Sequence, residues 1–392
     1  MTAKHGNKFI FFVFIFAALI IFDGFITPAS ASDVPAAEEL LASMTLRQKV
    51  GQLFVIRPDQ LDMKLTFDEI QDPKAQGVKE LTEGMKETLK RYPAGGFVLF
   101  GKNIAYPGQL KCFTKELAAA CFITPLMAVD EEGGRVARIA NSGGFDVPRF
   151  ESMQALGAGG STGRVKEAAS AIGAYIREYG FNMDLAPVCD VNTNPENIVI
   201  GNRAFGSDPS LVSAMAGAYL DGLHEQGVAG SMKHFPGHGD TASDTHTGRV
   251  TTDKTWDELL HAELVPFIGN LDKADSVMAA HITLSKVTKD GLPASLSEEL
   301  ITGRLRNELG YGGVVITDAL SMGAVREEHT SAEAAVLAFK AGCDILLMPW
   351  NYAGAFNGVL RAVYDGSISR ARLDESVMRI LKLKTGIAAR AR

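Results

Sequence analysis

The sequence predicts an α/β protein with the fold of a single (β/α)8 TIM barrel, and three observations support this fold class. Eight short apolar runs alternate with longer segments of helical periodicity, which is typical of a parallel α/β protein. Several of these runs end in a polar side chain, as barrel strands do at the face that carries an active site. No glycine-rich phosphate-binding loop follows the first run, which disfavours a doubly wound open sheet.

The apolar runs define the predicted strands in chain order. They cover residues 51–56, 95–100, 125–130, 181–190, 228–234, 276–281, 313–318 and 343–348. Covering helices are predicted between them at 164–179, 210–226, 256–271 and 331–341. The charged stretch 57–93 does not fit this repeat, and we interpret it as a solvated helical insertion between the first two strands.

Polar residues end several of the predicted strands. They are Asp130, Asp190, Lys233 with His234, His281 and Asp318. Because the carboxyl ends of parallel barrel strands converge on one face, we expect these side chains to form a single catalytic site there.

The composition is that of an ordinary globular protein. The chain has 392 residues, of which 46% are hydrophobic and 22% charged, which suffices for the core of one barrel domain. Its net charge of −7 and the lack of a long basic run argue against a nucleic acid partner. We expect a monomer that needs no cofactor and no metal ion.

The first 31 residues have the pattern of a secretory signal. Lys4, His5 and Lys8 precede an apolar run over 9–22, and the small residues of 28–31 follow it. We expect cleavage after Ala31, a domain over 32–392, and export to the periplasm or the outside of the cell. An uncleaved membrane anchor is the alternative, but Asp23 interrupts the run short of a bilayer span.

The four cysteines are scattered without the spacing of a redox or zinc motif. We predict that Cys112, Cys121, Cys189 and Cys343 are buried free thiols. A disulfide between Cys112 and Cys121 is the alternative in an oxidising compartment.

The loop over 233–246 packs three histidines and two aspartates among glycine and proline. A metal site of His234, His238, Asp240 and His246 is one interpretation, but the histidines lack helical i,i+4 spacing and Lys233 is adjacent. A solvated surface loop is another. We favour an acid/base dyad in which the Asp244 carboxylate orients the His246 imidazole.

Asp318 is the best candidate nucleophile, because it follows the apolar run Gly-Val-Val-Ile-Thr at the carboxyl end of a predicted strand. A helix N-cap is the structural alternative for such an aspartate. Asp130, Arg203, Lys233 and His234 have the donors and acceptors to bind vicinal sugar hydroxyls. For Arg135 and Arg138, an ion pair with Glu131 or Glu132 is as well supported as a substrate contact.

At these residues the sequence resembles glycoside hydrolase family 3, in particular its bacterial β-N-acetylhexosaminidase branch, the NagZ-type enzymes. The resemblance covers nearly all of the chain after 31, and Lys-His-Phe-Pro-Gly-His-Gly followed by Asp-Thr-His is its specific signature. It implies a retaining mechanism with Asp318 as nucleophile and Asp244 with His246 as acid/base. It also implies that a terminal N-acetylglucosamine of a glycan contacts a set of binding residues: Asp130, Arg138, Arg203, Lys233 and His234.

A histidine acid replaces one of the two carboxylates that most glycosidases use, so activity should fall as pH rises through neutrality. Many cytosolic relatives lack a signal sequence, so here we expect peptidoglycan or chitin-type oligosaccharides as substrates. Too little chain follows the eighth strand for the second domain of some relatives. A phosphorylase, a catalytically silent sugar-binding protein and a metal hydrolase are the competing functions.

Overall fold

The computed structural model describes residues 1–2, 37–241, 245 and 248–391, and residues 35–392 form one compact unit. The predicted signal sequence therefore lies outside the described residues except for Met1 and Thr2. Among the described helices, none is both long and apolar enough to cross a bilayer.

Eight parallel strands form the central sheet in the order of the chain. They are β1 (Phe54–Ile56), β2 (Gly96–Leu99), β3 (Leu126–Val129), β6 (Met183–Asp184), β7 (Ala229–Phe235), β9 (Ser276–Ala279), β11 (Val314–Thr317) and β12 (Leu346–Leu347). β1 also pairs with β12, and a parallel bridge between Ile316 and Ile345 joins β11 to β12. The sheet thus closes on itself, which confirms the predicted (β/α)8 barrel.

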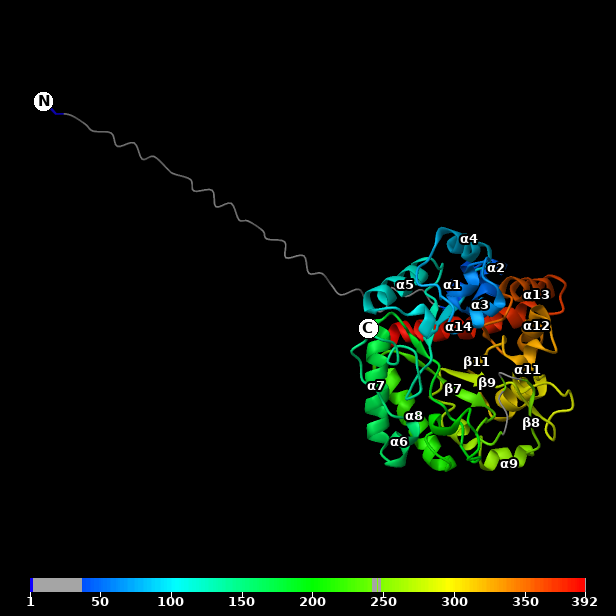
Figure 1. Ribbon diagram of the computed structural model, residues 1–392. Helices are drawn as coiled ribbons and strands as arrows, with labels where there is room; N and C mark the ends of the chain where they lie inside the picture. Colours follow the sequence, from blue (N-terminus) through cyan, green and yellow to red (C-terminus); the bar gives the residue numbers. More distant parts are fainter. Residues whose placement is uncertain (3–36, 242–244, 246–247, 392) are drawn as a thin grey trace. The chain divides into compact units, whose positions relative to one another are not determined.

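Helices cover the barrel between successive strands, and Figure 1 shows β7, β9 and β11 between α7 and α8 on one side and α12 and α13 on the other. The covering helices are α5 (Pro107–Ala119), α7 (Thr162–Glu178), α8 (Pro209–Glu225), α9 (Trp256–His261), α10 (Val265–Ile268), the π-helix Glu299–Glu308, α12 (Ser331–Ala341) and α13 (Tyr352–Tyr364). α8 begins with an ordinary cap, since Asp208 precedes Pro209 and accepts from the Leu211 amide at 2.7 Å.

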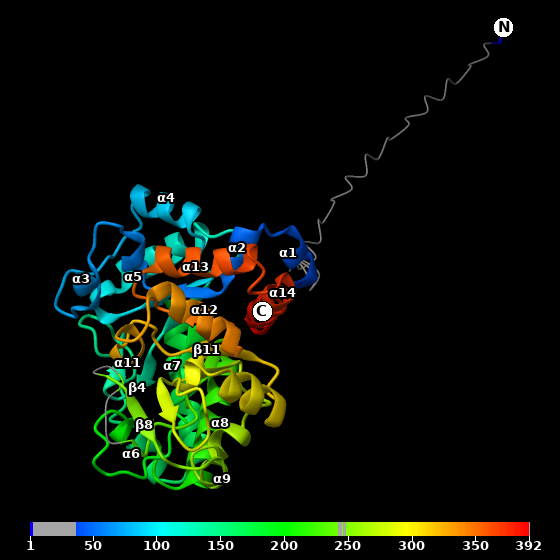
Figure 2. The same ribbon diagram turned by 90° about the vertical axis from the view of Figure 1, so that its right-hand side faces the viewer.

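The remaining α-helices and strands lie before the barrel, in its loops and after it. They are α1 (Ala37–Ser43), α2 (Leu46–Gln52), α3 (Phe67–Gln71), α4 (Glu83–Arg91), α6 (Met153–Ala158), α11 (Gly323–Arg326), α14 (Arg370–Arg390), the hairpin of β4 (Glu131–Gly133) and β5 (Val136–Ala137), and the parallel pair β8 (Val250–Thr252) and β10 (Ile282–Leu284). Helices α1 and α14 pack side by side (Figure 2).

Three expectations about the elements need correction. Residues 51–53 do not begin a strand, because a capping box of Thr45 and Gln48 starts α2, which continues to Gln52. The helix expected over 256–271 is two short helices, since Pro266 has no amide hydrogen to continue a helix through Ala262. The insertion 57–93 is not wholly solvated, because Arg57 and Asp59 are buried.

All four cysteines are free, so the disulfide alternative is wrong. Cys189 and Cys343 are buried as expected. Cys112 is exposed because it lies on the solvent face of the surface helix α5, and Cys121 is half-buried just beyond the end of that helix.

Candidate active site

A cavity of about 850 Å³ opens at the carboxyl ends of the barrel strands. Six residues predicted from the sequence line it, namely Asp130, Arg138, Arg203, Lys233, His234 and Asp318. Asp130 and Asp318 directly follow β3 and β11, and Lys233 and His234 lie at the end of β7. Arg138 and Arg203 lie in the loops after β3 and β6, so the barrel topology itself brings the six residues together.

Asp318 directly follows β11 and faces the cavity. Its amide donates to the carbonyl oxygen of Ala279 on β9 at 2.8 Å, and its Oδ1 accepts from the Ala319 amide at 2.7 Å. The next helix, α11, has Met322 as its N-cap, so Asp318 does not cap a helix. The helix N-cap, which was the alternative role for this aspartate, is therefore wrong.

His281 contacts the residue that follows Asp318. Its two ring nitrogens lie 2.6 Å from Ser295 Oγ and 2.9 Å from the carbonyl oxygen of Ala319. The imidazole is buried and is not among the described residues that line the cavity. We therefore interpret this strand-end histidine as a support for the Asp318 loop rather than as a substrate ligand.

The hairpin of β4 and β5 places Arg138 beside Asp130. Gly133 and Gly134 both have positive φ, which allows the tight reversal between the two strands. The buried Glu131 carboxylate accepts from the amides of Ile139 and Ala140, each at 2.8 Å, and fixes the returning strand. Arg138 Nη2 then donates to Asp130 Oδ2 at 3.1 Å.

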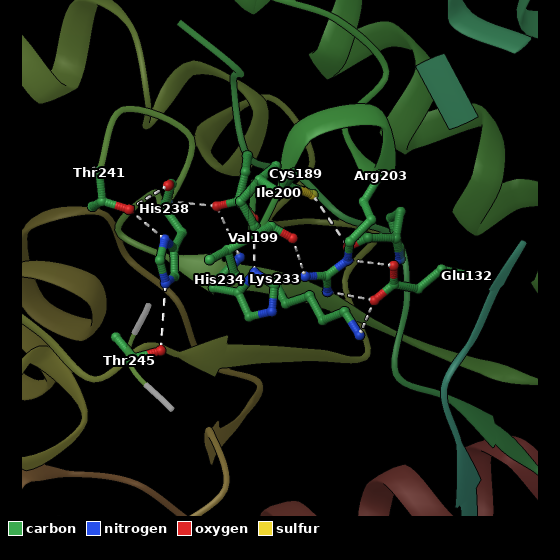
Figure 3. A network of polar contacts seen from close by, with 12 residues as sticks. Glu132, Cys189, Val199, Ile200, Arg203, Lys233, His234, His238, Thr241 and Thr245 are labelled. Carbon is green, nitrogen blue, oxygen red and sulfur yellow. Dashed lines mark hydrogen bonds and ion pairs between the residues drawn. The ribbon is translucent and has the colours of Figure 1, made fainter. Parts of the chain in front are cut away.

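Glu132 is the centre of a buried ion cluster that Figure 3 shows in part. The Arg203 guanidinium contacts it in a bidentate arrangement, with Nε at 2.8 Å and Nη2 at 2.7 Å from its oxygens. Lys233 Nζ lies 2.6 Å from Glu132 Oε1 and 2.8 Å from Asp130 Oδ1. The cluster of Arg138, Asp130, Lys233, Glu132 and Arg203 therefore alternates in charge across the cavity.

The charges of this cluster stay fixed near neutral pH. Burial opposes ionisation of Glu132, but the charges of Arg203 and Lys233 outweigh it and lower the pKa of Glu132 to about 2. Burial is likewise outweighed at Asp130, whose pKa Lys233 and Arg138 hold well below its ordinary value. The pKa of Lys233 is raised, because Asp130 and Glu132 overcome the effect of its burial.

Asp190 orients His234 and the loop that follows. Its Oδ2 lies 2.7 Å from His234 Nδ1, and its Oδ1 accepts from the amide of His238 at 2.7 Å. Nε2 of His234 has no partner among the described residues, and the ring lines the cavity. The residue after His238, Gly239, has to be a glycine, because a Cβ at this position would lie 2.0 Å from the carbonyl oxygen of Val191.

The proposed dyad, Asp244 and His246, lies outside the described residues. Thr245, between them in the sequence, is buried and lines the cavity, and its Oγ1 is 3.4 Å from His238 Nε2 (Figure 3). Within the described parts of the chain, no group of three His, Cys, Asp or Glu residues could hold a metal ion. Asp240 instead contacts Thr193 and Lys254.

Two arginines have partners other than those expected from the sequence. Arg138 pairs with Asp130, and Arg135 donates to the carbonyl oxygens of Ile198 and Val199, so neither pairs with Glu131 or Glu132. Two features of the cavity could not be predicted from the sequence. They are the central place of Glu132, whose partner Arg203 is 71 residues away, and the presence of Arg57. Only the repeated acidic pair after Asp130 could have drawn attention to Glu132.

A parallel (β/α)8 barrel with a polar cavity at the carboxyl ends of its strands has the architecture of barrel enzymes. The sequence model described as the glycosyl hydrolase family 3 N terminal domain matches residues 45–383. The chain therefore belongs to glycosyl hydrolase family 3, as the resemblance indicated.

Relatives in this family carry hexosaminidase names. Beta-hexosaminidase A of Pseudoalteromonas piscicida is 33% identical over 91% of this chain and 62% of its own length. The beta-hexosaminidase of Idiomarina loihiensis is 35% identical over 70% of this chain and 82% of its own length. The solved glycoside hydrolase family 3 beta-N-acetylglucosaminidase from Paenibacillus sp. str. FPU-7 superposes with a TM-score of 0.79 at 36% identity, covering 88% of this chain and 63% of that one. The chain thus spans less than two thirds of two of these three proteins.

Proposed function

We propose that the protein is a retaining glycoside hydrolase that removes terminal β-linked N-acetylglucosamine from a glycan. The observation that carries this proposal is the position of Asp318, a strand-end carboxylate in the same cavity as a charged cluster suited to sugar hydroxyls. The hexosaminidase names of relatives at 33–35% identity support the N-acetylated sugar.

The cluster orients the sugar in this proposal. Asp130 accepts hydrogen bonds, Arg138 and Lys233 donate them, and His234 adds Nε2 on a ring held by Asp190. Ion pairs at 2.6–3.1 Å hold these side chains in place before substrate arrives, so little ordering is left for the binding step. The anomeric carbon is then presented to the Asp318 carboxylate.

The reaction has two displacements. Asp318 attacks the anomeric carbon while the imidazolium of His246 gives its proton to the departing oxygen. Water then attacks the glycosyl ester, gives a proton to His246, and releases the sugar and the Asp318 carboxylate. The Asp244 carboxylate orients and stabilises the imidazolium, and Thr245 at the cavity is consistent with a dyad that acts there.

Hydrolysis of 4-nitrophenyl β-N-acetylglucosaminide tests the function, with the matching β-glucoside as the comparison. We expect release from the acetamido sugar alone, and its loss in a His246→Ala variant. A second series with added inorganic phosphate should yield free sugar and no sugar 1-phosphate. Failure to release nitrophenol from either glycoside would exclude a glycosidase, whereas sugar 1-phosphate would identify a phosphorylase.

Replacing Glu132 by glutamine should lower kcat/KM for the N-acetylglucosaminide roughly 10- to 100-fold, mainly through KM. The substitution keeps the shape of the side chain but removes the anion that holds Arg203 and Lys233, which leaves two buried cations undercompensated. Glu178→Gln is the matched control, because Glu178 has an exposed ion pair with Lys111 at 2.7 Å. Equal kinetics of the two variants would remove Glu132 from the binding machinery.

Substrate source and location belong to the same proposal. The apolar run 9–22 and the small residues of 28–31 support export, and an exported enzyme would encounter peptidoglycan or chitin-type oligosaccharides. We propose that it works as a monomer. Cell fractionation and N-terminal sequencing of the mature chain would test export and the expected cleavage after Ala31.

A further inference from the structure

The cavity has more cationic than anionic side chains. Among the described residues that line it, seven are lysine or arginine and three are aspartate or glutamate. Most of the cations are already compensated: Lys233 and Arg203 pair with Glu132, and Lys102 donates to the carbonyl oxygens of Glu69 and Ile70. Arg326 is exposed and lies over the ring of Phe67, whereas Arg57 is buried and Arg138 half-buried, and both use little of their hydrogen-bonding capacity.

Arg57 is a buried cation whose side chain makes no hydrogen bond to any described residue. It follows β1, lines the cavity and is 4% exposed. Its Nε lies 3.8 Å from Asp59 Oδ2, beyond hydrogen-bond distance, and Asp59 already accepts from Asn103 at 2.8 Å. Burial lowers the pKa of Arg57, as expected for a cation that its surroundings compensate poorly.

A second guanidinium shares the same aromatic ring. The Arg57 guanidinium carbon lies 4.4 Å from the centroid of Phe100, and that of Arg138 lies 5.0 Å from it. Arg138 has one hydrogen bond to Asp130, and its Nε has no partner among the described residues. Besides burial, the charge of Arg138 lowers the pKa of Arg57, so the two cations interact. Planar guanidinium groups match an oxyanion in bidentate geometry.

We propose that Arg57 and Arg138, packed on Phe100, form an oxyanion subsite that binds a carboxylate carried by the substrate. This inference rests on the proposed function and narrows its substrate to anionic β-N-acetylglucosaminides. The carboxylate is either a substituent of the sugar itself or part of the leaving group, and both would bind the two guanidinium groups in the same way.

The position of Arg57 favours a substrate carboxylate over a free phosphate. Arg57 follows β1 and Asp318 follows β11, and β12 lies between these strands. Two strand spacings separate their backbones by roughly 10 Å. A phosphate that attacks the anomeric carbon would have to lie next to Asp318, whereas a substituent elsewhere on the glycan reaches Arg57.

The test compares three fluorogenic substrates. One is 4-methylumbelliferyl β-N-acetylglucosaminide, which is neutral; the second is its 3-carboxyumbelliferyl counterpart; the third is the neutral compound with a 3-O-lactyl ether on the sugar. For each enzyme, the ratio of kcat/KM on an anionic substrate to kcat/KM on the neutral one cancels general effects of a substitution. We expect Arg57→Gln to lower one of the two ratios at least tenfold, because a charge-assisted hydrogen bond is lost. Which ratio falls identifies the source of the carboxylate.

Arg47→Gln is the matched control. Arg47 also stacks on an aromatic ring, at 4.9 Å from the centroid of Phe356, but it does not line this cavity. Its substitution should leave both ratios unchanged. Arg57→Lys keeps the charge without the planar fork and should lower the affected ratio less than Arg57→Gln does.

Each other outcome overturns the inference in a distinguishable way. If the wild type hydrolyses the neutral substrate but Arg57→Gln leaves both ratios unchanged, the subsite is wrong and the proposed function stands. If the wild type hydrolyses none of the three substrates, the proposed function fails as well. If added inorganic phosphate accelerates the wild type but not Arg57→Gln, Arg57 binds phosphate and not a substrate carboxylate. If Arg57→Gln does not unfold cooperatively, it is not properly folded and Arg57→Lys becomes the deciding variant. Unchanged ratios in Arg57→Lys then overturn the proposal.

Discussion

Asp318→Asn should lower the turnover of a β-N-acetylglucosaminide on the order of 10⁴-fold, the largest loss expected of any single substitution. An amide cannot form the glycosyl ester that splits the reaction into two displacements, and it does not stabilise the positive charge that develops on the sugar. The cavity and the cluster around Glu132 should persist, because Asp318 caps no helix. Thermal unfolding of the variant should therefore match that of the wild type closely.

Chemical rescue separates a nucleophile from a residue that only supports the fold. In Asp318→Gly, azide can enter the vacated space and attack the anomeric carbon in a single displacement. The product should be the α-glycosyl azide, whereas the wild type, with two displacements, should release the β-sugar. Asp208→Asn is the control for the isosteric change, because Asp208 caps α8 and is not among the residues that line the cavity.

Two results would contradict the assignment of Asp318. The first is an Asp318→Asn variant that keeps more than a tenth of wild-type turnover. The second is an Asp318→Gly variant that folds but gives no azide product at any azide concentration that leaves the control active. Either would leave the barrel and its family unaffected and would move the nucleophile to another residue of the cavity.

The strands could be predicted from the sequence because a buried parallel strand needs apolar side chains on both faces. β11 is such a run, and each of the eight strands lies within its predicted range or extends it by one residue. Boundaries were less predictable where two signals compete. The apolar residues before β1 continue from a helix that a capping box starts at Thr45, and apolarity alone does not separate the two elements.

The gathering of the strand-end side chains in one cavity could be predicted from the sequence, but their pairing with one another could not. Asp130, Lys233 and Asp318 line one cavity because parallel strands end on one face. The partners of Glu132 come from the loop after β6 and from β7, and no spacing in the sequence indicates contacts of that range. Arg57 looked like part of a charged, solvated stretch, because the burial of a charged side chain on Phe100 depends on tertiary packing.

The stability of the barrel should depend on pH through a lysine at the opposite end from the cavity. Lys384 on α14 donates to Gln52 Oε1 at 2.7 Å and to the carbonyl oxygen of Gly95 at 2.8 Å, near the amino ends of β1 and β2. Burial lowers the pKa of Lys384 to about 7, and the nearby Cys121 opposes this effect. In the unfolded chain an exposed lysine keeps its proton up to a pH of about 10.4.

Lys384→Met should therefore change the pH dependence of the free energy of unfolding. Between pH 7 and about 10 the unfolded chain binds more protons at Lys384 than the folded chain does, so this residue makes stability rise with pH. The slope approaches 1.4 kcal/mol per pH unit above the folded pKa, and the full effect is about 5 kcal/mol. Methionine has no such linkage and keeps the apolar stem, so the stability of the variant relative to the wild type should fall by about 2 kcal/mol between pH 7.5 and 9.

Denaturant unfolding of both proteins at several pH values measures this difference, and other titrating groups cancel in it because both chains share them. Lys382→Met is the matched control, since Lys382 lies on the same helix but is exposed. Its difference from the wild type should not vary with pH. A flat difference for Lys384→Met as well would show that the buried ammonium keeps its proton, and that Gln52 and Gly95 compensate its charge better than burial penalises it.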